Sequence, residues 1–463
     1  MSSKRPNIGV TGNLEALRDR LAGEIVLPGD GGWDAARQAW NLSVDQHPVS
    51  VVFPKAAEDV ASVVEVAGRH GLRVAAQGTG HSAGPMGPLD ETILVKTSRM
   101  RGVEIDAQAN RARVGAGALW GEVVPAAAEH GLAALAGSAK DVGVVGYTLG
   151  GGIGWLARRH GLACSSVLAA EAVTADGLIV GADAEREPDL FWALRGGGGS
   201  FAIVTALEFA LHAVEEVYAG ALYWPLERAG EVLHAWRELV AAAPVELTSL
   251  GRLMQFPPVP EVPEPFRGRA FALVEAAYCG PEADGAALFQ QLRSLGPELD
   301  TLATIPVEGL GELHMDPPQP VPFAGDGMLL AELPADAVDA LVGIAGAGSG
   351  SPLLSVEVRH LGGALAKGSP SNGALSSIEA GFALYAVGVA MNAEMKAAVH
   401  AHAARVQDAL AAWSAGRSFM NFTERHTDPG EFFDATTYER LRRVKADYDP
   451  DAVIRANHSI SVA

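Results

Sequence analysis

Three glycine-rich segments, all within a stretch of about 125 residues, constrain the fold of this chain more than any other feature. They are Gln77–Gly78–Thr79–Gly80–His81–Ser82, the run 146–154 and the run 196–201. Glycine lets backbone N–H groups turn towards phosphate oxygens and approach them closely. Lysine and arginine are sparse within these segments, so backbone donors would have to hold a diphosphate. One such segment alone predicts only a tight turn, but the three together favour a nucleotide or dinucleotide site.

A fourth segment, 115–121, offers a different interpretation. It follows a predicted strand and opens a predicted helix, as the turn of a Rossmann fold does. Its last glycine, Gly121, stands one residue late, and no acidic residue ends a second strand about 20 positions further on. The sequence therefore argues against a NAD-type site at this position.

The length of the chain predicts more than one hydrophobic core. It has 463 residues, whereas single cores stop growing at about 250–300 residues. Two domains, or one domain split around another, are the expected organisation. Beyond about residue 215 the glycine-rich segments stop, and predicted strands alternate with predicted helices, which indicates an antiparallel sheet with helices. The strands are expected at 219–223, 269–278, 353–358 and 382–389, and the helices at 228–243, 284–295, 335–344 and 393–412.

Charge and cysteine content exclude several classes of function. The formal net charge is −20, which disfavours binding to nucleic acid and to anionic membrane surfaces. The basic residues Arg442, Arg443 and Lys445 are interpreted as one solvated helix face. The two cysteines, Cys164 and Cys279, cannot build a cysteine-based metal site, and we expect no metal.

No targeting or membrane segment is expected. Residues 1–11 lack the apolar core of a signal peptide. The most apolar stretch, 380–393, is 14 residues long and contains two glycines, which is too short to span a bilayer. We therefore expect a cytoplasmic protein that is a monomer or a homodimer.

Residue periodicity predicts the elements around the glycine-rich segments. Strands are expected at 48–54, 72–76, 92–95 and 201–211, and helices at 56–70 and 120–130, each ended by a glycine. Hairpins are expected at 103–114 and 168–180. Residues 25–45 are expected to be irregular, and the proline-rich residues 311–326 to form an extended loop.

His81, within the first glycine-rich segment, is the residue with the most informative chemistry. It is either a histidine that hydrogen-bonds its own loop or a nucleophile, since imidazole is nucleophilic near neutral pH. The small neighbours Gly80 and Ser82 leave room for a flat ring system beside it.

Taken together, these segments resemble the vanillyl-alcohol-oxidase superfamily of FAD-linked oxidases with a PCMH-type FAD-binding domain, in its berberine-bridge-enzyme-like branch. The resemblance covers residues 49–213 and returns at 438–460. It is carried by Gly78–Thr79–Gly80–His81–Ser82, by the run 141–152, by the run 189–201, and by Tyr438–Glu439–Arg440–Leu441 with Tyr448–Asp449–Pro450.

The resemblance implies an α+β fold and a cofactor. It implies a split FAD-binding domain at 1–215, a substrate domain with an antiparallel sheet and helices at 216–412, and a return of the chain to the FAD domain at 413–463. It implies an 8α-histidyl bond from His81 to FAD. The position of a second, cysteinyl bond in many relatives is occupied by Ala139, so we expect one bond. The oxygen-gating position falls on Val142, which favours an oxidase. The other expected cofactor contacts are Gln77, Gly78, Thr79, Gly80, Ser82, Gly143, Gly146, Tyr147, Gly150, Gly151, Gly152, Gly198, Gly199, Phe201, Val204 and Asn457.

The catalytic residues are less clearly marked. A tyrosine that often precedes the family's active-site asparagine is missing, because the sequence here is Phe419–Met420–Asn421, and Asn421 is expected at the flavin edge. The strand 382–390 carries no acid, and Tyr385 is its only polar side chain.

A base is sought instead on the strand around Glu357. Residues 355, 357 and 359 share one face of a strand. Glu357 resembles, in its setting, an active-site glutamate of a bacterial member of the family. The alternative is a surface ion pair between Glu357 and Arg359, and His314 is a further candidate pocket residue.

The expected reaction is hydride transfer to FAD from a C–H bond next to nitrogen or oxygen in a small molecule, with O2 as the acceptor and Glu357 taking the proton. The alternatives are a sugar oxidase, a flavin dehydrogenase with another acceptor, and a flavin-binding protein without activity.

Overall fold

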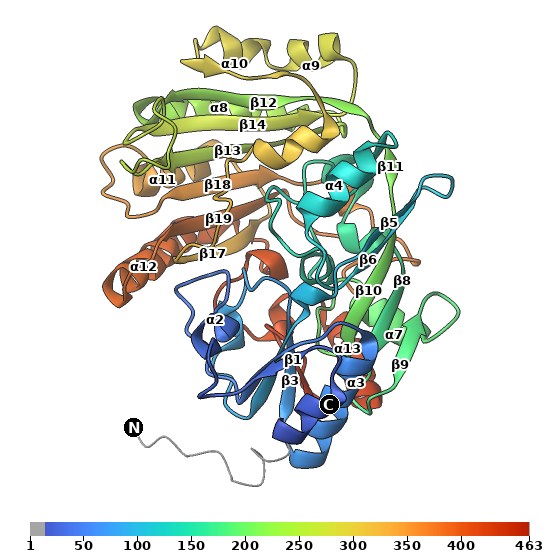
Figure 1. Ribbon diagram of the computed structural model, residues 1–463. Helices are drawn as coiled ribbons and strands as arrows, with labels where there is room; N and C mark the ends of the chain where they lie inside the picture. The colour runs from blue at the N-terminus through green and yellow to red at the C-terminus, as the bar shows by residue number, and fades with distance from the viewer. Residues whose placement is uncertain (1–13, 463) are drawn as a thin grey trace.

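The computed structural model describes residues 14–462, and Figure 1 shows two halves packed against each other. The lower half in Figure 1, here called the glycine-loop half, contains two five-stranded sheets. The upper half is built on one eight-stranded sheet, here called the large sheet. Residues 1–11, in which no signal peptide is expected, lie outside the residues that the structure describes.

The first sheet of the glycine-loop half joins distant parts of the chain. Its strands, in spatial order, are β1 (Glu24–Val26), β2 (Ser50–Phe53), β4 (Thr92–Lys96), β3 (Arg73–Gln77) and β20 (Ile454–Arg455). All pairs are parallel except β1 with β2. Helix α3 (Ala57–His70) packs six buried valines and alanines on this sheet and ends at Gly71, whose φ of 65° suits glycine.

The second sheet is antiparallel and carries the remaining glycine-rich segments. Its order is β5 (Val103–Asp106), β6 (Arg111–Gly115), β10 (Ile203–Ala210), β8 (Val167–Val173) and β9 (Ile179–Ala182). A small sheet pairs β7 (Leu132–Ala133) with β11 (His212–Ala213). The helices of this half are α2 (Trp33–Arg37), α4 (Trp120–Ala128), α5 (Val144–Leu149), α6 (Ala157–His160), α7 (Pro188–Leu194) and α13 (Ala435–Tyr448).

The large sheet is antiparallel and has one apolar face and one face, here called the polar face, that carries charged side chains among apolar ones. Its order is β15 (Leu299–Asp300), β12 (Glu216–Pro225), β14 (Ala270–Tyr278), β13 (Leu247–Gln255), β18 (Ser355–His360), β19 (Phe382–Val389) and β17 (Phe323–Leu330), and β16 (Ala303–Pro306) also pairs with β12. Side chains alternate between the faces of a strand. Val356 and Val358 therefore enter the core under the helices, whereas Glu357 points to the opposite face.

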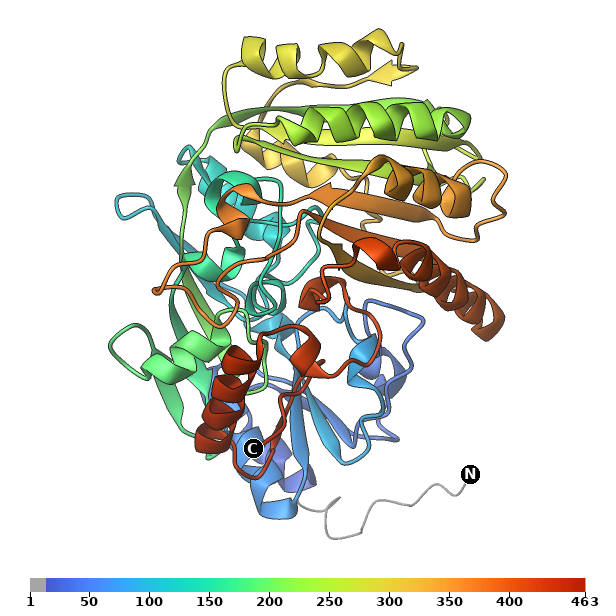
Figure 2. The ribbon, with the colours of Figure 1, turned by 180° about the vertical axis from the view of Figure 1, so that it is seen from behind.

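Helices cover only the apolar face of the large sheet. Figure 2 shows three of them, α8 (Ala229–Ala241), α11 (Ala335–Ala345) and α12 (Ala393–Ala409), lying on it. Two short helices, α9 (Glu282–Leu288) and α10 (Gln290–Ser294), lie at the outer end of the large sheet in Figure 1. The opposite face of the large sheet meets the glycine-loop half, where Arg359 and Tyr385 contact the Phe422 ring.

The observed elements confirm the α+β fold and most predicted strands and helices, with four corrections. Residues 25–45 are not wholly irregular, because β1 and α2 form there. The proline-rich segment 311–326 is not all loop, since β17 begins at Phe323. Strand β13 was not predicted at all, and the helix expected at 284–295 is divided into α9 and α10. No helix among residues 14–462 is both long and apolar enough to cross a bilayer.

Lys445 corrects the interpretation of a solvated helix face. Its side chain is 1% exposed, and its ammonium donates to the carbonyls of Ser200 at 2.6 Å and of Ile454 at 3.0 Å, and to the carboxylate of Asp449. Asp449 in turn accepts from the backbone N–H groups of Val453 and Ile454. This buried pair therefore joins α13, β20 and the third glycine-rich segment.

Replacing Lys445 by Met is expected to destabilise the fold by about 3–5 kcal/mol, because the buried Asp449 carboxylate loses its counter-ion. The matched control is Arg443→Met on the same helix, whose side chain is 66% exposed and should cost close to nothing. Thermal unfolding of both variants measures the difference. Equal melting temperatures for the two would contradict the assigned role of the pair.

Candidate active site

His81 is held on three sides in the turn that follows β3. Its Nδ1 lies 2.7 Å from the Thr79 hydroxyl, and its ring stacks on Trp40 with centroids 4.0 Å apart and planes inclined by 19°. Its Nε2 lies 3.6 Å from Oδ2 of Asp141 and has no hydrogen-bond partner. The imidazole is thus fixed in place with one nitrogen unsatisfied.

Asp141 is the charged neighbour of this imidazole. Trp40 donates its indole N–H to the same carboxylate oxygen. Burial raises the pKa of Asp141, but interactions with His81 and Trp40 outweigh that effect and hold it below its usual value. An ionised carboxylate beside His81 can accept or stabilise a proton on the ring.

The glycine-rich loops meet next to His81 and leave space between them. A Cβ on Gly143 would lie 3.9 Å from the Gly78 Cα, so the first two loops are nearly in contact. Gly78 and Gly199 are half-buried, yet a Cβ on either would meet no atom within 4 Å. Both loops carry buried polar atoms without partners, namely Gln77 Oε1 and His81 Nε2 in the first and Tyr147 Oη and Thr148 Oγ1 in the second. A half-buried space with unsatisfied polar atoms fits a bound FAD.

Asn421 clamps the second glycine-rich loop. Its amide oxygen accepts from the N–H of Gly152 at 3.0 Å, and its amide nitrogen donates to the Tyr147 carbonyl at 3.2 Å. A Cβ on Gly150 would lie 2.7 Å from that nitrogen, which explains the glycine. Both ends of the Asn421 amide are therefore used, and its geometry is that of a positioning residue for the loop.

The other expected cofactor residues divide into two sets. Asn457 donates to the Ser82 carbonyl and so ties the C-terminal segment to the His81 loop. Half-buried Val142 uses its carbonyl to accept from the Trp120 N–H at 3.1 Å. Phe201 and Val204, in contrast, are 0% and 4% exposed within the core beneath the second sheet, so their side chains support the loop from below. The remaining glycines of the set turn the loops: Gly80, Gly151, Gly152 and Gly198 have positive φ, and Gly146 is exposed.

The polar face of the large sheet carries a buried ion network opposite these loops. Glu357 accepts from Arg359 Nε at 2.6 Å and lies 3.0 Å from Nε2 of His314. Nδ1 of His314 contacts Glu275, which lies 3.2 Å from Arg252. Glu357 is 2% exposed, so the alternative of a surface pair with Arg359 is wrong.

The geometry fixes the charges within this network. Both ring nitrogens of His314 face carboxylates, so both carry protons and the ring is an imidazolium. Burial and Arg252 lower the pKa of His314, but Glu275, Asp316 and Glu357 raise it to about 9. Burial raises the pKa of Glu357, but Arg359 and His314 hold it far below its usual range. Glu357 is therefore a permanently ionised carboxylate.

A second carboxyl group on the same side behaves in the opposite way. Glu424 is half-buried, and Tyr385 lies near enough to act on its carboxyl group. Burial and the nearby Asp326 raise the pKa of Glu424 to about 8, against the opposing effects of Tyr385 and Lys396. Burial also raises the pKa of Tyr385 well above its ordinary value. This pair can hold or release a proton near neutral pH.

Sequence reasoning missed several of these groups, namely Trp40, Asp141, Arg252, Glu275 and Glu424. Arg252 and Glu275 each stand alone among apolar residues in a strand, a pattern that signals a buried charge with a partner. Glu424 follows Asn421 by three residues, and proximity to that motif was its only signal. No local pattern marks Trp40, which lies 101 residues from Asp141.

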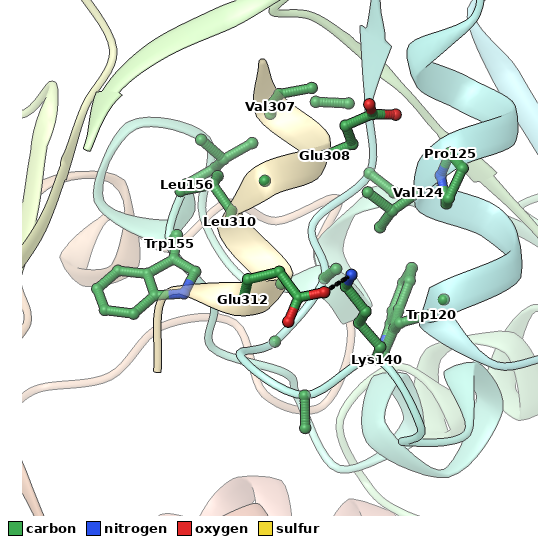
Figure 3. A pocket seen from close by; sticks show the side chains of 18 residues that line it. Trp120, Val124, Pro125, Lys140, Trp155, Leu156, Val307, Glu308, Leu310 and Glu312 are labelled. Carbon is green, nitrogen blue, oxygen red and sulfur yellow. Dashed lines mark hydrogen bonds and ion pairs between the residues drawn. The ribbon is translucent and has the colours of Figure 1, made fainter. Parts of the chain in front are cut away.

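A separate cavity of about 430 Å³ lies behind the second glycine-rich loop (Figure 3). Its walls come from α4, from residues 133–140 and from the short 3-10 helix Val307–Glu312. Figure 3 shows the ion pair of Lys140 with Glu312 across it. A Cβ on Gly137, which lines the cavity, would lie 3.0 Å from the Tyr147 ring, so that ring borders the cavity wall.

Comparison with known proteins matches two parts of the chain to family models. Residues 48–183 match an FAD binding domain, and residues 418–461 match the domain described as "Berberine and berberine like". The chain is 35% identical over 205 residues to (R)-6-hydroxynicotine oxidase of Paenarthrobacter nicotinovorans, covering 44% of this chain and 45% of that protein. It is 38% identical over 189 residues to glucooligosaccharide oxidase of Sarocladium strictum, covering 40% and 38%. The matches thus span less than half the length of these two relatives.

Solved structures match over nearly the whole chain. The crystal structure of 6-hydroxy-D-nicotine oxidase from Arthrobacter nicotinovorans has a TM-score of 0.81 at 26% identity, covering 95% of this chain and 98% of that one. The BBE-like 1 protein of Physcomitrella patens has a TM-score of 0.85 at 21% identity, covering 97% and 99%. A glucooligosaccharide oxidase from Acremonium strictum, described as holding 6-S-cysteinyl, 8α-N1-histidyl FAD, has a TM-score of 0.81 at 23% identity, covering 98% and 99%.

The charge on His314 makes a pH-dependent contribution to stability. The folded pKa of about 9 lies above the unfolded value near 6.5, so this contribution is complete below pH 6.5 and is lost as the pH rises through 9. His314→Gln should cost on the order of 3 kcal/mol at pH 6, and the gap to the wild type should narrow towards pH 10. Melting temperatures across this pH range measure it. The exposed His130→Gln is the control, and a gap of constant size for His314→Gln would refute the charged imidazole.

Proposed function

We propose, because this chain belongs to the FAD-linked oxidoreductases with a berberine-like C-terminal domain, that it oxidises a C–H bond next to nitrogen or oxygen in a small organic molecule and passes the electrons to O2. The FAD-binding domain supplies the cofactor site. When bound, FAD supplies the hydride acceptor and the centre that dioxygen reoxidises. The residues of this chain then have to hold FAD, admit the substrate and take up one proton.

The observation that carries the proposal is the environment of His81. Its ring is stacked on Trp40, held by Thr79 and left with one unsatisfied nitrogen beside an ionised Asp141. A nucleophile of this kind, at the edge of a space that fits FAD, supports a covalent histidyl bond. The glucooligosaccharide oxidase from Acremonium strictum is described as holding FAD through a cysteinyl bond in addition to the histidyl bond. The matching position here is Ala139, so the proposed attachment is through His81 alone.

The proton acceptor is proposed to be Glu424, acting with Tyr385. Protonating Glu357 would break its pairs with Arg359 and His314, which makes it a poor base. Glu424 has no cation at hydrogen-bond distance among the described residues, and its pKa near 8 allows it to exchange a proton at working pH. Glu357 instead holds Arg359 and His314 in place, which makes it a positioning residue.

The covalent bond is tested by denaturing the purified protein. Wild-type polypeptide precipitated by acid should be yellow and heavier by one FAD, whereas His81→Ala should precipitate colourless and His130→Gln should match the wild type. Flavin found only in the supernatant of the wild type would remove the covalent bond from the proposal. Flavin absent from both fractions would remove FAD itself. A screen of amines, alcohols and sugars for peroxide release then tests the oxidase activity.

The role of Glu424 is tested by the pH profile of flavin reduction. The rate should rise as the pH passes about 8, because the group must be deprotonated to act as a base. Glu424→Gln should lower the rate of flavin reduction by about 100-fold and abolish the rise in rate near pH 8. The exposed Glu332→Gln is the control. An unchanged profile in Glu424→Gln would show that the proton goes to another group.

A further inference from the structure

The guanidinium of Arg359 has unused hydrogen-bond donors on the face of the large sheet that meets the glycine-loop half. Its Nε is bonded to Glu357, but its two terminal nitrogens have no acceptor among residues 14–462. The side chain is 14% exposed, so a ligand can reach the guanidinium. Charged donors that are mostly withdrawn from water favour a partner with acceptor atoms.

The charges around Arg359 are balanced, but its guanidinium is not fully hydrogen-bonded. The three cations Arg252, Arg359 and His314 are matched by three carboxylates, Glu275, Glu357 and Asp316, the last of which acts on both His314 and Arg359. Of these carboxylates, Glu357 alone is hydrogen-bonded to Arg359, through Nε. An anion with two acceptor oxygens would complete the hydrogen bonding of the two terminal nitrogens.

The surroundings of Arg359 describe the shape of that anion. The guanidinium lies 5.1 Å from the centre of the Phe422 ring, and the Tyr385 ring lies 5.4 Å from Phe422. Tyr147 is close enough for the charge of Arg359 to act on it, and its buried hydroxyl has no hydrogen-bond partner. Arg359 is thus an arginine fork beside aromatic rings, and its charge acts on one unpartnered hydroxyl.

We propose that Arg359, assisted by Tyr147, binds a carboxylate of the substrate, so that the oxidised molecule is a small, flat carboxylic acid. This inference rests on the proposed function, since it assigns the substrate of the same site. Arginine recognises carboxylates through two parallel N–H donors, which a lysine cannot reproduce. A cationic amine has no acceptor atom for these donors, and a neutral sugar offers only hydroxyl oxygens, which accept more weakly than a carboxylate.

The test measures ligand binding to the flavin-loaded protein and does not depend on turnover. Benzoate, benzylamine and benzyl alcohol are the probes, because they share a ring and differ in charge. Calorimetry and the shift in flavin absorbance give the dissociation constants for wild type, Arg359→Gln, Arg359→Lys and Tyr147→Phe. Arg440→Gln, on an exposed arginine beside Trp192, is the control.

Benzoate should bind to the wild type at least about 10-fold more tightly than the other two probes. Arg359→Gln should weaken benzoate roughly 30-fold, and Tyr147→Phe about 5-fold. Arg359→Lys should keep only part of the affinity. Arg440→Gln should change nothing.

Tighter binding of benzylamine, or equal benzoate binding in wild type and Arg359→Gln, would overturn the assignment. So would an altered flavin spectrum in Arg359→Gln with benzoate binding unchanged, because Arg359 would then serve the cofactor. If Arg359→Gln does not fold, the benzoate affinities of Arg359→Lys and Tyr147→Phe test the assignment instead. Wild-type affinity in both variants would overturn it. The intact mass of the wild type and of each variant shows whether flavin is attached. Wild-type protein that carries flavin but does not bind benzoate contradicts the substrate assignment and leaves the proposed FAD-dependent function standing.

Discussion

The packing between the first glycine-rich segment and the start of α5 is the constraint on which the rest of the site depends. Gly143, at the N-terminal end of α5, lies so near Gly78 and Thr79 that a Cβ there would be in van der Waals contact with both, at 3.9 Å. His81 is three residues from Gly78, and Tyr147 is four residues from Gly143. The position of the His81 nucleophile relative to the Tyr147 hydroxyl is therefore set by backbone packing, with Asn421 as the brace.

The buried ion network is the second fixed element, and it is rigid for an electrostatic reason. Charges removed from water are tolerated only when every partner keeps its geometry. His314, from the segment between the Val307–Glu312 helix and β17, holds Glu275 and Glu357 on two different strands. A rotation of any one member would leave a buried charge unpaired. The network therefore holds Arg359 with little freedom.

The parts of the fold that could be predicted from sequence are those whose cause is local. Glycine-rich turns, the helix 57–70 that ends at Gly71, and His81 between Gly80 and Ser82 all carry their signal within a few residues. The failures share a different cause. Lysine, glutamate and arginine usually lie on the surface, so the sequence around Lys445, Glu357 and Arg359 gives no sign of burial. These side chains are buried only because distant segments of the chain pack against them. Strand β17 was hidden by prolines that stop at Pro322, and Trp40 had no signal because its partner lies far along the chain.

The pairing of β20 with β3 has a consequence for how the molecule is made. The His81 turn follows β3 directly, but its outer neighbour β20, the Lys445–Asp449 pair and the Asn457 bond to Ser82 all come from residues 445–457. A ribosome delivers the early strands long before these residues emerge. This edge of the glycine-loop half therefore cannot be completed before residue 457 has been synthesised, so the surroundings of the His81 turn are among the last parts of the fold to be finished.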